Sequence, residues 1–428
     1  MPMTNSALPG PDDIAREVLP NGITVLVREN FSNQSVVLTG SLAVGSIYER
    51  AEQAGLAGFV ASALMRGTIN RDFDTLHEAL EGIGASLGFG GDTHTTGFGG
   101  KALAEDLPVL LDLLSDTVRN PAFPIDQVER LRGEILTGLK IRAQDTRAVA
   151  GESFRKLAYP PEHPYSRSPL GEIDTIGAIT LDALREFHAT HYGPRGMILV
   201  VVGAVKADAA IQMVKDALGG WENPDQPEPP SLPELSPLPE SRRAFTFVPG
   251  KTQADIVLGW PGPSRFAPDF QAANLANNIL GVFGMMGRLG KSVREEQGLA
   301  YYSFSRMRGG EGPGPWSMNA GVNPANVQRA IDSILREVER ITSEPVSAED
   351  LADNKANFTG RLPLTLESNE GVAASILNME TYRLGLDYLR RYAGIINAIT
   401  AEEVQRAARK YLSPEAYALA VAGPESEA

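Results

Sequence analysis

The chain repeats one of its own segments. Residues 176–203 (IGAITLDALREFHATHYGPRGMILVVVG) align without a gap with residues 396–423 (INAITAEEVQRAARKYLSPEAYALAVAG), at a constant offset of 220 residues. In each copy a threonine, Thr180 or Thr400, stands where a helix N-cap is preferred, and an acidic first turn follows. A helix, a proline turn and an apolar strand come next in both copies. Self-similarity at a fixed offset predicts two related domains.

A proline-rich connector separates the two copies. Residues 221–243 (WENPDQPEPPSLPELSPLPESRR) contain seven prolines. Proline at this density interrupts helices and central strands and favours an extended linker. We therefore predict an N-terminal domain at 1–220, a linker at 221–243 and a C-terminal domain at 244–428.

Helical and strand patterns occur together in each half. The patterns predict a hairpin over 16–29 that turns at Asn21-Gly22, strands at 36–45, 197–202, 244–250, 254–260 and 417–422, and helices at 52–66, 72–83, 104–119, 124–144 and 267–283. A glycine-rich stretch at 88–100 lacks the spacing of a phosphate-binding loop and fits a flexible loop or an edge strand. The predicted fold class is α+β, with antiparallel or mixed sheets and helices on one face.

Composition excludes several classes of function. A net charge of −14 argues against binding to nucleic acid or to anionic membranes. The absence of cysteine removes disulfides, thiolate metal sites and cysteine nucleophiles. No signal-peptide pattern and no apolar run of transmembrane length is visible, so a cytoplasmic location is expected, with a processed precursor left open.

Residues 55–68 (GLAGFVASALMRGT) resemble the helix that carries the inverted zinc motif, His-x-x-Glu-His, in the pitrilysin/insulinase family of metallopeptidases. The surrounding frame is retained at Gly55, Leu56, Ala57, Phe59, Gly67 and Thr68. The three positions that carry the chemistry are Gly58, Ala61 and Ser62, which offer neither an imidazole nor a carboxylate. This helix therefore cannot bind zinc or supply the general base.

The resemblance spans nearly the whole chain, including AVGSIYE (43–49), HPYSRSPLG (163–171) and YGP (192–194). It implies two α+β domains that face each other like a clamshell around an enclosed chamber. It also implies that the third ligand, a glutamate, falls at Gly138, with Glu134 one helical turn away as the nearest carboxylate. All four zinc-site positions are thus empty, and we expect no zinc in this chain.

The histidines do not suggest another metal site. His188 and His191 fit the C-terminal end of a helix, where a positive charge is favoured by the helix dipole. His94 fits an exposed strand position, His163 a loop and His77 a solvated helix. A serine triad is also unsupported, because no Gly-x-Ser-x-Gly turn is present.

The second half carries the remaining chemistry. Residues 287–305 (GRLGKSVREEQGLAYYSFS) resemble the family's second-domain motif, in which an arginine and a tyrosine seven residues later face the zinc. Arg294 and Tyr301 occupy these positions, and the resemblance implies that they bind the scissile carbonyl and the oxyanion. Alternatively, Arg294 caps a helix end and Tyr301 starts a buried strand. Arg288 is a weaker candidate that could pair with Glu295 or face solvent.

The resemblance includes a branch of two-chain enzymes, namely bacterial heterodimeric peptidases and mitochondrial processing peptidase, in which one subunit supplies zinc and the other the Arg/Tyr pair. This chain is similar to the subunit without zinc. We therefore expect a zinc-bearing homologous partner, and unfolded peptides as substrates, with Arg294 and Tyr301 contributed in trans. The alternative is a structural or peptide-binding homologue without catalysis, and an active homodimer would hold no zinc site.

Overall fold

The computed structural model describes residues 8–282 and 287–425, which divide into two compact units. Unit 1 takes the residues up to Thr137, Ser168–Ser231 and Arg361–Tyr392. Unit 2 takes Gly138–Arg167, Leu232–Gly360 and the residues from Ala393 onward. Each unit therefore contains a segment from the opposite side of the proline-rich connector, and the connector itself is divided between the units.

Unit 1 is built on a six-stranded mixed sheet. Its strands, in spatial order, are β1 (Ala15–Val18), β2 (Thr24–Glu29), β6 (Ile198–Gly203), β3 (Ser35–Leu42), β5 (Thr96–Leu103) and β4 (Ser86–Gly91). Only β2 and β6 run parallel, and every other neighbouring pair is antiparallel. The predicted hairpin at 16–29 is confirmed, with Gly22 at its turn in the left-handed region (φ +93) that suits glycine.

Unit 2 repeats this plan with five strands. They are β7 (Arg242–Phe247), β11 (Ala418–Gly423), β8 (Ala254–Pro261), β10 (Pro315–Val322) and β9 (Ala300–Met307). Again one pair, β7 and β11, is parallel and the rest are antiparallel. The α+β class with two mixed sheets, predicted from the sequence, is confirmed.

The internal repeat corresponds to equivalent elements of the two units. The helices that follow the two threonines are α7 (Leu181–His191) and α14 (Ala401–Tyr411), and each leads to the second strand of its unit's parallel pair, β6 or β11. The hydroxyl of Thr180 accepts a hydrogen bond from the amide of Ala183, and that of Thr400 from the amide of Glu403. Both predicted N-caps are therefore confirmed.

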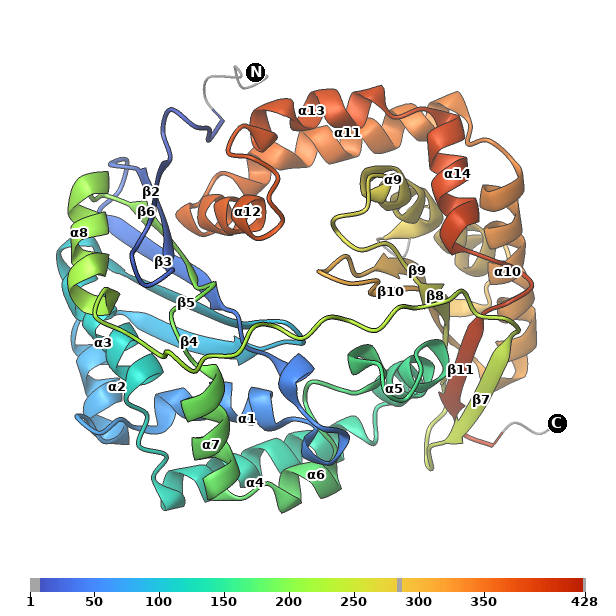
Figure 1. The fold of residues 1–428 in the computed structure, drawn as a ribbon. Coiled ribbons are helices and arrows are strands. Elements are labelled where there is room, and N and C mark those ends of the chain that lie inside the picture. Colours follow the sequence, from blue (N-terminus) through green and yellow to red (C-terminus); the bar gives the residue numbers. More distant parts are fainter. Residues whose placement is uncertain (1–7, 283–286, 426–428) are drawn as a thin grey trace. The chain divides into compact units, whose positions relative to one another are not determined.

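Helices cover both faces of each sheet, so the prediction of helices on one face was wrong (Figure 1). In unit 1 the helices are α1 (Leu56–Ala63), α2 (Phe73–Gly82), α3 (Leu107–Arg119), α6 (Ile173–Ala178), α7, α8 (Ala207–Leu218) and α12 (Asn369–Thr381). In unit 2 they are α5 (Thr146–Ala158), α9 (Phe270–Gly281), α10 (Val327–Ser343) and α14. Three helices, α4 (Ile125–Arg142), α11 (Ala348–Thr365) and α13 (Tyr388–Ala398), pass from one unit to the other. The helix predicted at 267–283 is α9, and residue 283 lies outside the described residues.

Each sheet is covered on one face by a helix from the other half of the chain, so the two halves exchange equivalent segments. Helix α12 packs on β3 and β6 of unit 1, where its Val372 and Ile376 join a buried cluster with Val37 and Val200. Helix α5 packs on β8 and β11 of unit 2, where Phe154 joins Val257 and Ala420. Each helix has 13 residues and comes from the half of the chain that does not supply the sheet. Periodicity along the sequence cannot reveal such an exchange, because it is a long-range contact.

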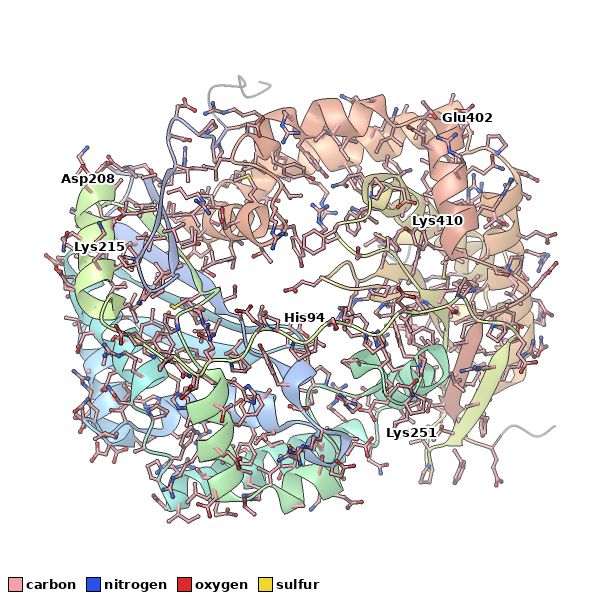
Figure 2. The ribbon with its side chains drawn as sticks, viewed as in Figure 1. His94, Asp208, Lys215, Lys251, Glu402 and Lys410 are labelled. Atoms are coloured by element: carbon pink, nitrogen blue, oxygen red, sulfur yellow. The ribbon has the colours of Figure 1, made fainter. Side chains whose placement is uncertain are left out.

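The glycine-rich stretch is an ordered hairpin of β4 and β5, and β4 is an edge strand of the sheet. Of the two predicted alternatives, the edge strand is therefore confirmed. The prediction that His94 lies in a strand was wrong, because this residue lies in the turn between β4 and β5 (Figure 2). Among the described helices, none combines the length and the apolar character that a membrane-spanning segment requires.

Candidate functional site

The N-terminus of helix α1 in unit 1 is stabilised by the conformation of a glycine and by a buried carboxylate. Gly55 precedes it with φ +93, a conformation that side chains other than glycine rarely adopt. The buried carboxylate of Glu49 accepts hydrogen bonds from the amides of Ala57 (2.6 Å) and Gly55 (3.0 Å). These bonds satisfy amides at the helix N-terminus that lack an intrahelical partner, and the negative charge suits that end of the helix dipole.

The three degenerate zinc positions on α1 are occupied by packing contacts. A Cβ atom at Gly58 would lie 2.9 Å from the carbonyl oxygen of Pro169, and the backbone of Gly91 in β4 lies close against Gly58 on the same helix. Ala61 is completely buried. The hydroxyl of Ser62 donates to the carbonyl of Gly58 at 2.9 Å, within the helix. Restoring a histidine at 58 would therefore require the backbone around Pro169 to move.

The fourth position offers no replacement ligand. Gly138 lies on α4, and the nearby carboxylate of Glu134 forms ion pairs with Arg66 and Arg130. Across the described residues, no three His, Cys, Asp or Glu side chains come together in a group that could hold a metal ion. The residues at the positions of the family motif thus do not fit zinc, because they supply neither its ligands nor the base that would activate a bound water.

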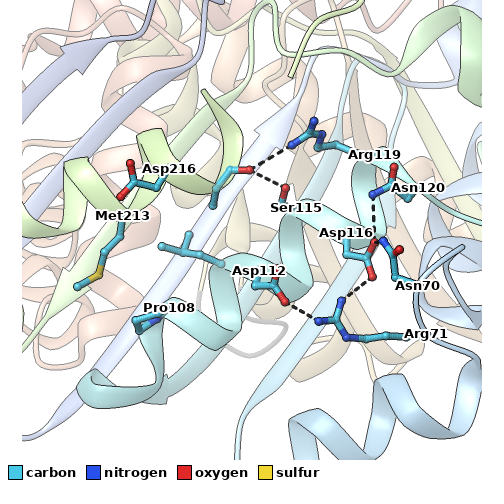
Figure 3. A pocket seen from close by; sticks show the side chains of 12 residues that line it. Asn70, Arg71, Pro108, Asp112, Ser115, Asp116, Arg119, Asn120, Met213 and Asp216 are labelled. Atoms are coloured by element: carbon cyan, nitrogen blue, oxygen red, sulfur yellow. Dashed lines mark hydrogen bonds and ion pairs between the residues drawn. The ribbon is translucent and has the colours of Figure 1, made fainter. Parts of the chain in front are cut away.

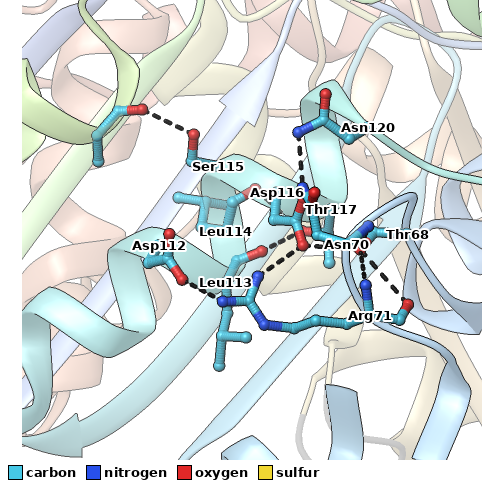
Figure 4. Close-up of polar contacts among 11 residues, drawn as sticks. Thr68, Asn70, Arg71, Asp112, Leu113, Leu114, Ser115, Asp116, Thr117 and Asn120 are labelled. Carbon is cyan, nitrogen blue, oxygen red and sulfur yellow. Dashed lines mark hydrogen bonds and ion pairs between the residues drawn. The ribbon is translucent and has the colours of Figure 1, made fainter. Parts of the chain in front are cut away.

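Gly67 and Thr68, at the C-terminal end of the segment 55–68, have a structural role. Thr68 follows Gly67, whose φ of +123 requires glycine, and its hydroxyl donates to the buried carboxylate of Asp116 on α3 at 2.7 Å (Figure 4). Asn70 and Arg71 donate to the same carboxylate at 2.7 and 2.6 Å. Burial would raise the pKa of Asp116, but the hydrogen bonds from its neighbours outweigh it and lower the pKa. The network lines a surface pocket between α3 and α8 (Figure 3).

The histidines take part in local packing. His188 on α7 donates to the carbonyl oxygen of Val118 at 2.9 Å, and burial lowers the pKa of its ring, so packing rather than charge explains this residue. Burial also lowers the pKa of His191. His163 is fully buried and its Nδ1 accepts from the amide of Tyr165, whereas His77 bonds to the carbonyl of Phe73 on α2.

Arg294 lies in an unusual helical turn of unit 2. The turn, η7 (Gly290–Glu295), is a π-helix, with the amide of Glu296 bonded to the carbonyl of Lys291 five residues earlier at 2.9 Å. Such turns are rare and occur frequently at functional sites. Within the described residues, the guanidinium of Arg294 has no hydrogen-bond or ion-pair partner. Its backbone carbonyl accepts from Gly298, which has φ +60 and turns the chain toward β9.

Tyr301 occupies an irregular position on the edge strand β9. In the ladder with β10, Val322 pairs with Ala300 and Gly321 pairs with Tyr302, so Tyr301 is the extra residue of a β-bulge. Bulges redirect side chains and are common beside active sites. The Tyr301 side chain is 79% exposed and has no partner among the described residues. It is therefore not a core residue, although it begins the strand.

The adjacent tyrosine has a different environment. The Tyr302 hydroxyl donates to the buried carboxylate of Asp255, and Arg147 donates to that hydroxyl at 2.9 Å while its guanidinium lies 3.8 Å from the ring centre. Burial and the Asp255 carboxylate raise the pKa of Tyr302. Of two neighbouring tyrosines, one is therefore fixed by a network and the other is free to contact a ligand.

The structure corrects the prediction for one arginine and adds a group of arginines. The pairing of Arg288 with Glu295 was wrong, because Arg288 contacts Asp350 on α11 at 3.3 Å and is largely buried. The predictions also missed a group of arginines around Arg155 that lines one pocket of unit 2. The alternating arginines in SRMRGG (305–310) were the available signal, since residues two apart on a strand share a face.

Comparison with known proteins finds similarity over most of the chain. A family model described as "Insulinase (Peptidase family M16)" matches residues 24–158, and one described as "Peptidase M16 inactive domain" matches residues 178–358. The chain is 26% identical over 419 residues to an uncharacterized zinc protease of Mycobacterium leprae, covering 96% of this chain and 92% of that protein. It is 27% identical over 371 residues to the mitochondrial-processing peptidase subunit beta of Saccharomyces cerevisiae, covering 84% of this chain and 80% of the yeast protein.

Solved structures share the fold. A crystal structure titled as the peptidase M16 inactive domain from Pseudomonas fluorescens has a TM-score of 0.88 at 24% identity and covers 96% of this chain and 98% of that chain. A protease from Helicobacter pylori has a TM-score of 0.89 at 21% identity, covering 97% and 100%. The two sheets with their helices are those of a two-domain, insulinase-type peptidase fold. The chain is a homologue of the insulinase family, peptidase family M16, whose described residues include no evident metal site.

Proposed function

We propose that this chain is the zinc-less subunit of a heterodimeric metallopeptidase, and that Arg294 and Tyr301 act on peptides bound at the zinc site of a homologous partner. The observation that carries the proposal is the environment of these two side chains. Each belongs to an irregular element, a π-turn or a bulge, and neither has a structural partner among the described residues. π-Turns and β-bulges are frequent at functional sites, and side chains without a protein partner are available to contact a ligand.

The chemistry of the pair suits peptide hydrolysis. When water attacks a peptide carbonyl, negative charge develops on its oxygen. A guanidinium supplies permanently charged donors and a phenol supplies a neutral one, so Arg294 and Tyr301 can bind the carbonyl and stabilise the oxyanion. Zinc, when bound by the partner, would polarise the carbonyl and activate the water.

The name of one relative supports a partnership. The yeast protein is called a subunit beta, which indicates an enzyme of more than one kind of chain. A chain that keeps the fold, lacks zinc ligands and exposes an Arg/Tyr pair fits the complementary role in such an enzyme. Unfolded peptides are the expected substrates, because extended backbone can pair with an edge strand such as β4 or β9.

A second candidate is a peptide-binding homologue without catalysis. Its specific support is the edge strand β4, whose glycines Gly88 and Gly90 leave the strand surface open, with nothing within 4 Å of a Cβ atom built at either. An extended peptide could pair with this edge whether or not it is later cleaved. In that case Arg294 and Tyr301 would contribute to binding alone.

The test measures zinc content and peptide cleavage for the protein alone, for a homologue with an intact His-x-x-Glu-His helix alone, and for the mixture. The proposal expects zinc in the homologue and cleavage chiefly in the mixture. Arg294→Ala and Tyr301→Phe should reduce cleavage by the mixture, whereas Arg329→Ala, an exposed arginine on α10, should not. Stoichiometric zinc and full activity in this protein alone would refute the proposal, and an active mixture indifferent to both substitutions would favour the second candidate.

A further inference from the structure

A pocket of unit 2 concentrates positive charge in an acidic protein. The pocket, of about 350 Å³, is lined by residues of α5 and of strands β9 and β10. Its charged lining residues are Arg142, Asp145, Arg147, Arg155, Arg306 and Arg308. We call it the arginine pocket. Five cations and one carboxylate in so small a space contrast with the net charge of −14 for the whole chain.

The local structure explains how the arginines converge. Arg306 lies on β9, and Arg308 directly follows the end of this strand, with its amide donating to the carbonyl of Pro315 on β10 at 2.9 Å. Residues two apart in extended backbone share a face, as Ser317 and Asn319 do on β10. In the ladder Arg306 pairs with Ser317. From the opposite wall α5 contributes Arg147 and Arg155, and Arg142 comes from the end of α4.

These positive charges are not neutralised within the described residues. Asp145 already accepts a hydrogen bond from the amide of Ala148 as the N-cap of α5. Arg147 is engaged with Tyr302, but Arg142, Arg155, Arg306 and Arg308 have no side-chain hydrogen bond or ion pair among the described residues. Glu152 is the other acidic group close enough to act on Arg155.

Two guanidinium nitrogens of the pocket are buried and have no partner among the described residues. Nη1 of Arg155 and Nε of Arg142 are buried without a hydrogen-bond partner. Burial, followed by repulsion from Arg308, lowers the pKa of both Arg155 and Arg306. A buried, unpaired guanidinium donor is destabilising, and an oxyanion is the partner whose charge and geometry match it.

We infer that the arginine pocket binds carboxylates of an acidic peptide segment, which makes acidic peptides the preferred substrate class of the proposed peptidase. This inference rests on the proposed function for its choice of a peptide as the ligand. Guanidinium groups pair with carboxylates in a bidentate manner, and several arginines can hold adjacent acidic side chains or a C-terminal carboxylate. The hydroxyl of Ser317 and the amide of Asn319 supply neutral donors on the same wall.

The distance along the chain from Tyr301 to the arginine pocket predicts how far the acidic residue of a substrate lies from the cleaved bond. Arg306 and Arg308 follow Tyr301 by five and seven residues, on β9 and just beyond its end, which corresponds to roughly 16 and 23 Å of extended chain. A substrate that runs extended beside β9 has nearly the same rise per residue. The acidic group should therefore lie about five to seven residues from the bond whose carbonyl contacts Tyr301.

The first experiment measures binding to this protein alone. A fluorescent peptide with a run of glutamates is compared with its glutamine counterpart by fluorescence anisotropy. We expect the acidic peptide to bind at least about tenfold more tightly, an advantage that salt reduces and that the double variant Arg306→Gln/Arg308→Gln abolishes. The matched control, Arg329→Gln/Lys251→Gln, removes two positive charges outside the pocket and should keep the preference (Figure 2 labels Lys251).

Other outcomes contradict the inference. Equal binding of both peptides would overturn it, and so would binding of inorganic tripolyphosphate that depends on Arg306 and Arg308 when the acidic peptide does not bind. A thermal unfolding curve of the double variant shows whether lost binding reflects lost folding, and salt sensitivity in the wild-type protein gives a readout independent of the variants.

Cleavage by the mixture with a zinc-bearing partner separates this inference from the proposed function. If the mixture cleaves peptides but does not prefer an acidic residue about five to seven positions from the cleaved bond, the inference fails and the function stands. If the acidic peptide binds through Arg306 and Arg308 but no mixture is active, the function fails and the carboxylate site stands.

Discussion

Helix α1 of unit 1 and the η7–β9 segment of unit 2 differ in how far their motif residues are engaged in structural contacts. On α1 the frame residues have structural tasks: Gly55 and Gly67 adopt backbone angles that require glycine, and Thr68 bonds to Asp116. Of the zinc-chemistry positions on this helix, Gly58 is packed against the backbone of Pro169 and Gly91, Ala61 is buried, and Ser62 bonds within the helix. On η7 and β9 the reverse holds, because Arg294 and Tyr301 have no structural partner among the described residues. The difference teaches that the frame of a motif can be held by backbone geometry and hydrogen bonding where the zinc ligands of that motif are absent.

The strongest test of this contrast is loss of activity without loss of stability. In the active mixture, Arg294→Ala should reduce kcat by about 10²–10³-fold, and Tyr301→Phe by a similar or smaller factor, because each removes a donor to the oxyanion. Neither should lower the free energy of unfolding by more than about 0.5 kcal/mol, since both sites lack structural partners. The measurements are steady-state kinetics and urea unfolding. Ser62→Ala on α1 is the control and should leave kcat unchanged. If Arg294→Ala or Tyr301→Phe lowered kcat only in proportion to a loss of folding stability, the contrast between the two segments would be contradicted.

An attempt to restore the zinc motif should fail for structural reasons. Ala61→Glu places a carboxylate at a fully buried position and should destabilise unit 1 by about 3 kcal/mol or more. Gly58→His adds a Cβ atom 2.9 Å from the Pro169 carbonyl, for an additional cost of about 1–3 kcal/mol. Urea unfolding and metal analysis after dialysis with zinc check both effects. Ser62→His alone is the control and should be nearly neutral, and a stable triple variant with stoichiometric zinc would show that α1 is not closed to the metal.

Much of the fold was predictable because it depends on local signals. The repeat at 176–203 and 396–423, the two threonine caps and the hairpin at 16–29 all follow from short-range chemistry. The exchange of α5 and α12 was not predictable, because it depends on which sheet a helix meets and not on its own sequence. The same holds for the division of the proline-rich connector between the units.

For the candidate site, the sequence predicts residues but not their environment. The motif around Arg294 and Tyr301 could be found in the sequence, whereas the π-turn, the bulge and the contrast between Tyr301 and Tyr302 depend on strand register and on Asp255. Arg288 was misjudged for a similar reason, since its partner Asp350 lies on a distant helix. The arginine pocket joins residues from α4, α5 and β9, which no single motif contains.

The close approach of α1 to β4 gives a test of intermediate size. A Cβ atom at Gly91 would lie 2.9 Å from the Cα atom of Gly58, whereas a Cβ atom at Gly90 would meet nothing within 4 Å. Gly91→Ala should therefore lower the free energy of unfolding by about 1–3 kcal/mol. Gly90→Ala, one residue away on the same strand, is the matched control and should be neutral or slightly stabilising. Equal effects of the two substitutions in urea unfolding would mean that α1 and β4 do not pack as closely as proposed.

The smallest expected effect concerns stability at acidic pH and involves Asp116, the partner of the retained Thr68. The pKa of Asp116 is lowered in the folded protein, despite burial, by bonds from Thr68, Asn70, Asn120 and Arg71. Its unfolded pKa is about 3.9. A carboxylate with a lowered folded pKa contributes stability above its unfolded pKa, and this contribution is lost as the pH falls through the folded value.

Wild-type protein should therefore lose stability below about pH 4 more steeply than Asp116→Asn, which cannot titrate at this position. The variant should be less stable than wild type at neutral pH, because an amide pairs less well with Arg71. Asp112→Asn, which changes the exposed partner of Arg71, should have little effect on the loss of stability at acidic pH. The free energy of unfolding of wild type and both variants, measured from neutral to acidic pH, tests these expectations. Parallel curves for wild type and Asp116→Asn would mean that the retained Thr68 is held by hydrogen-bond geometry alone and not by the charge of Asp116.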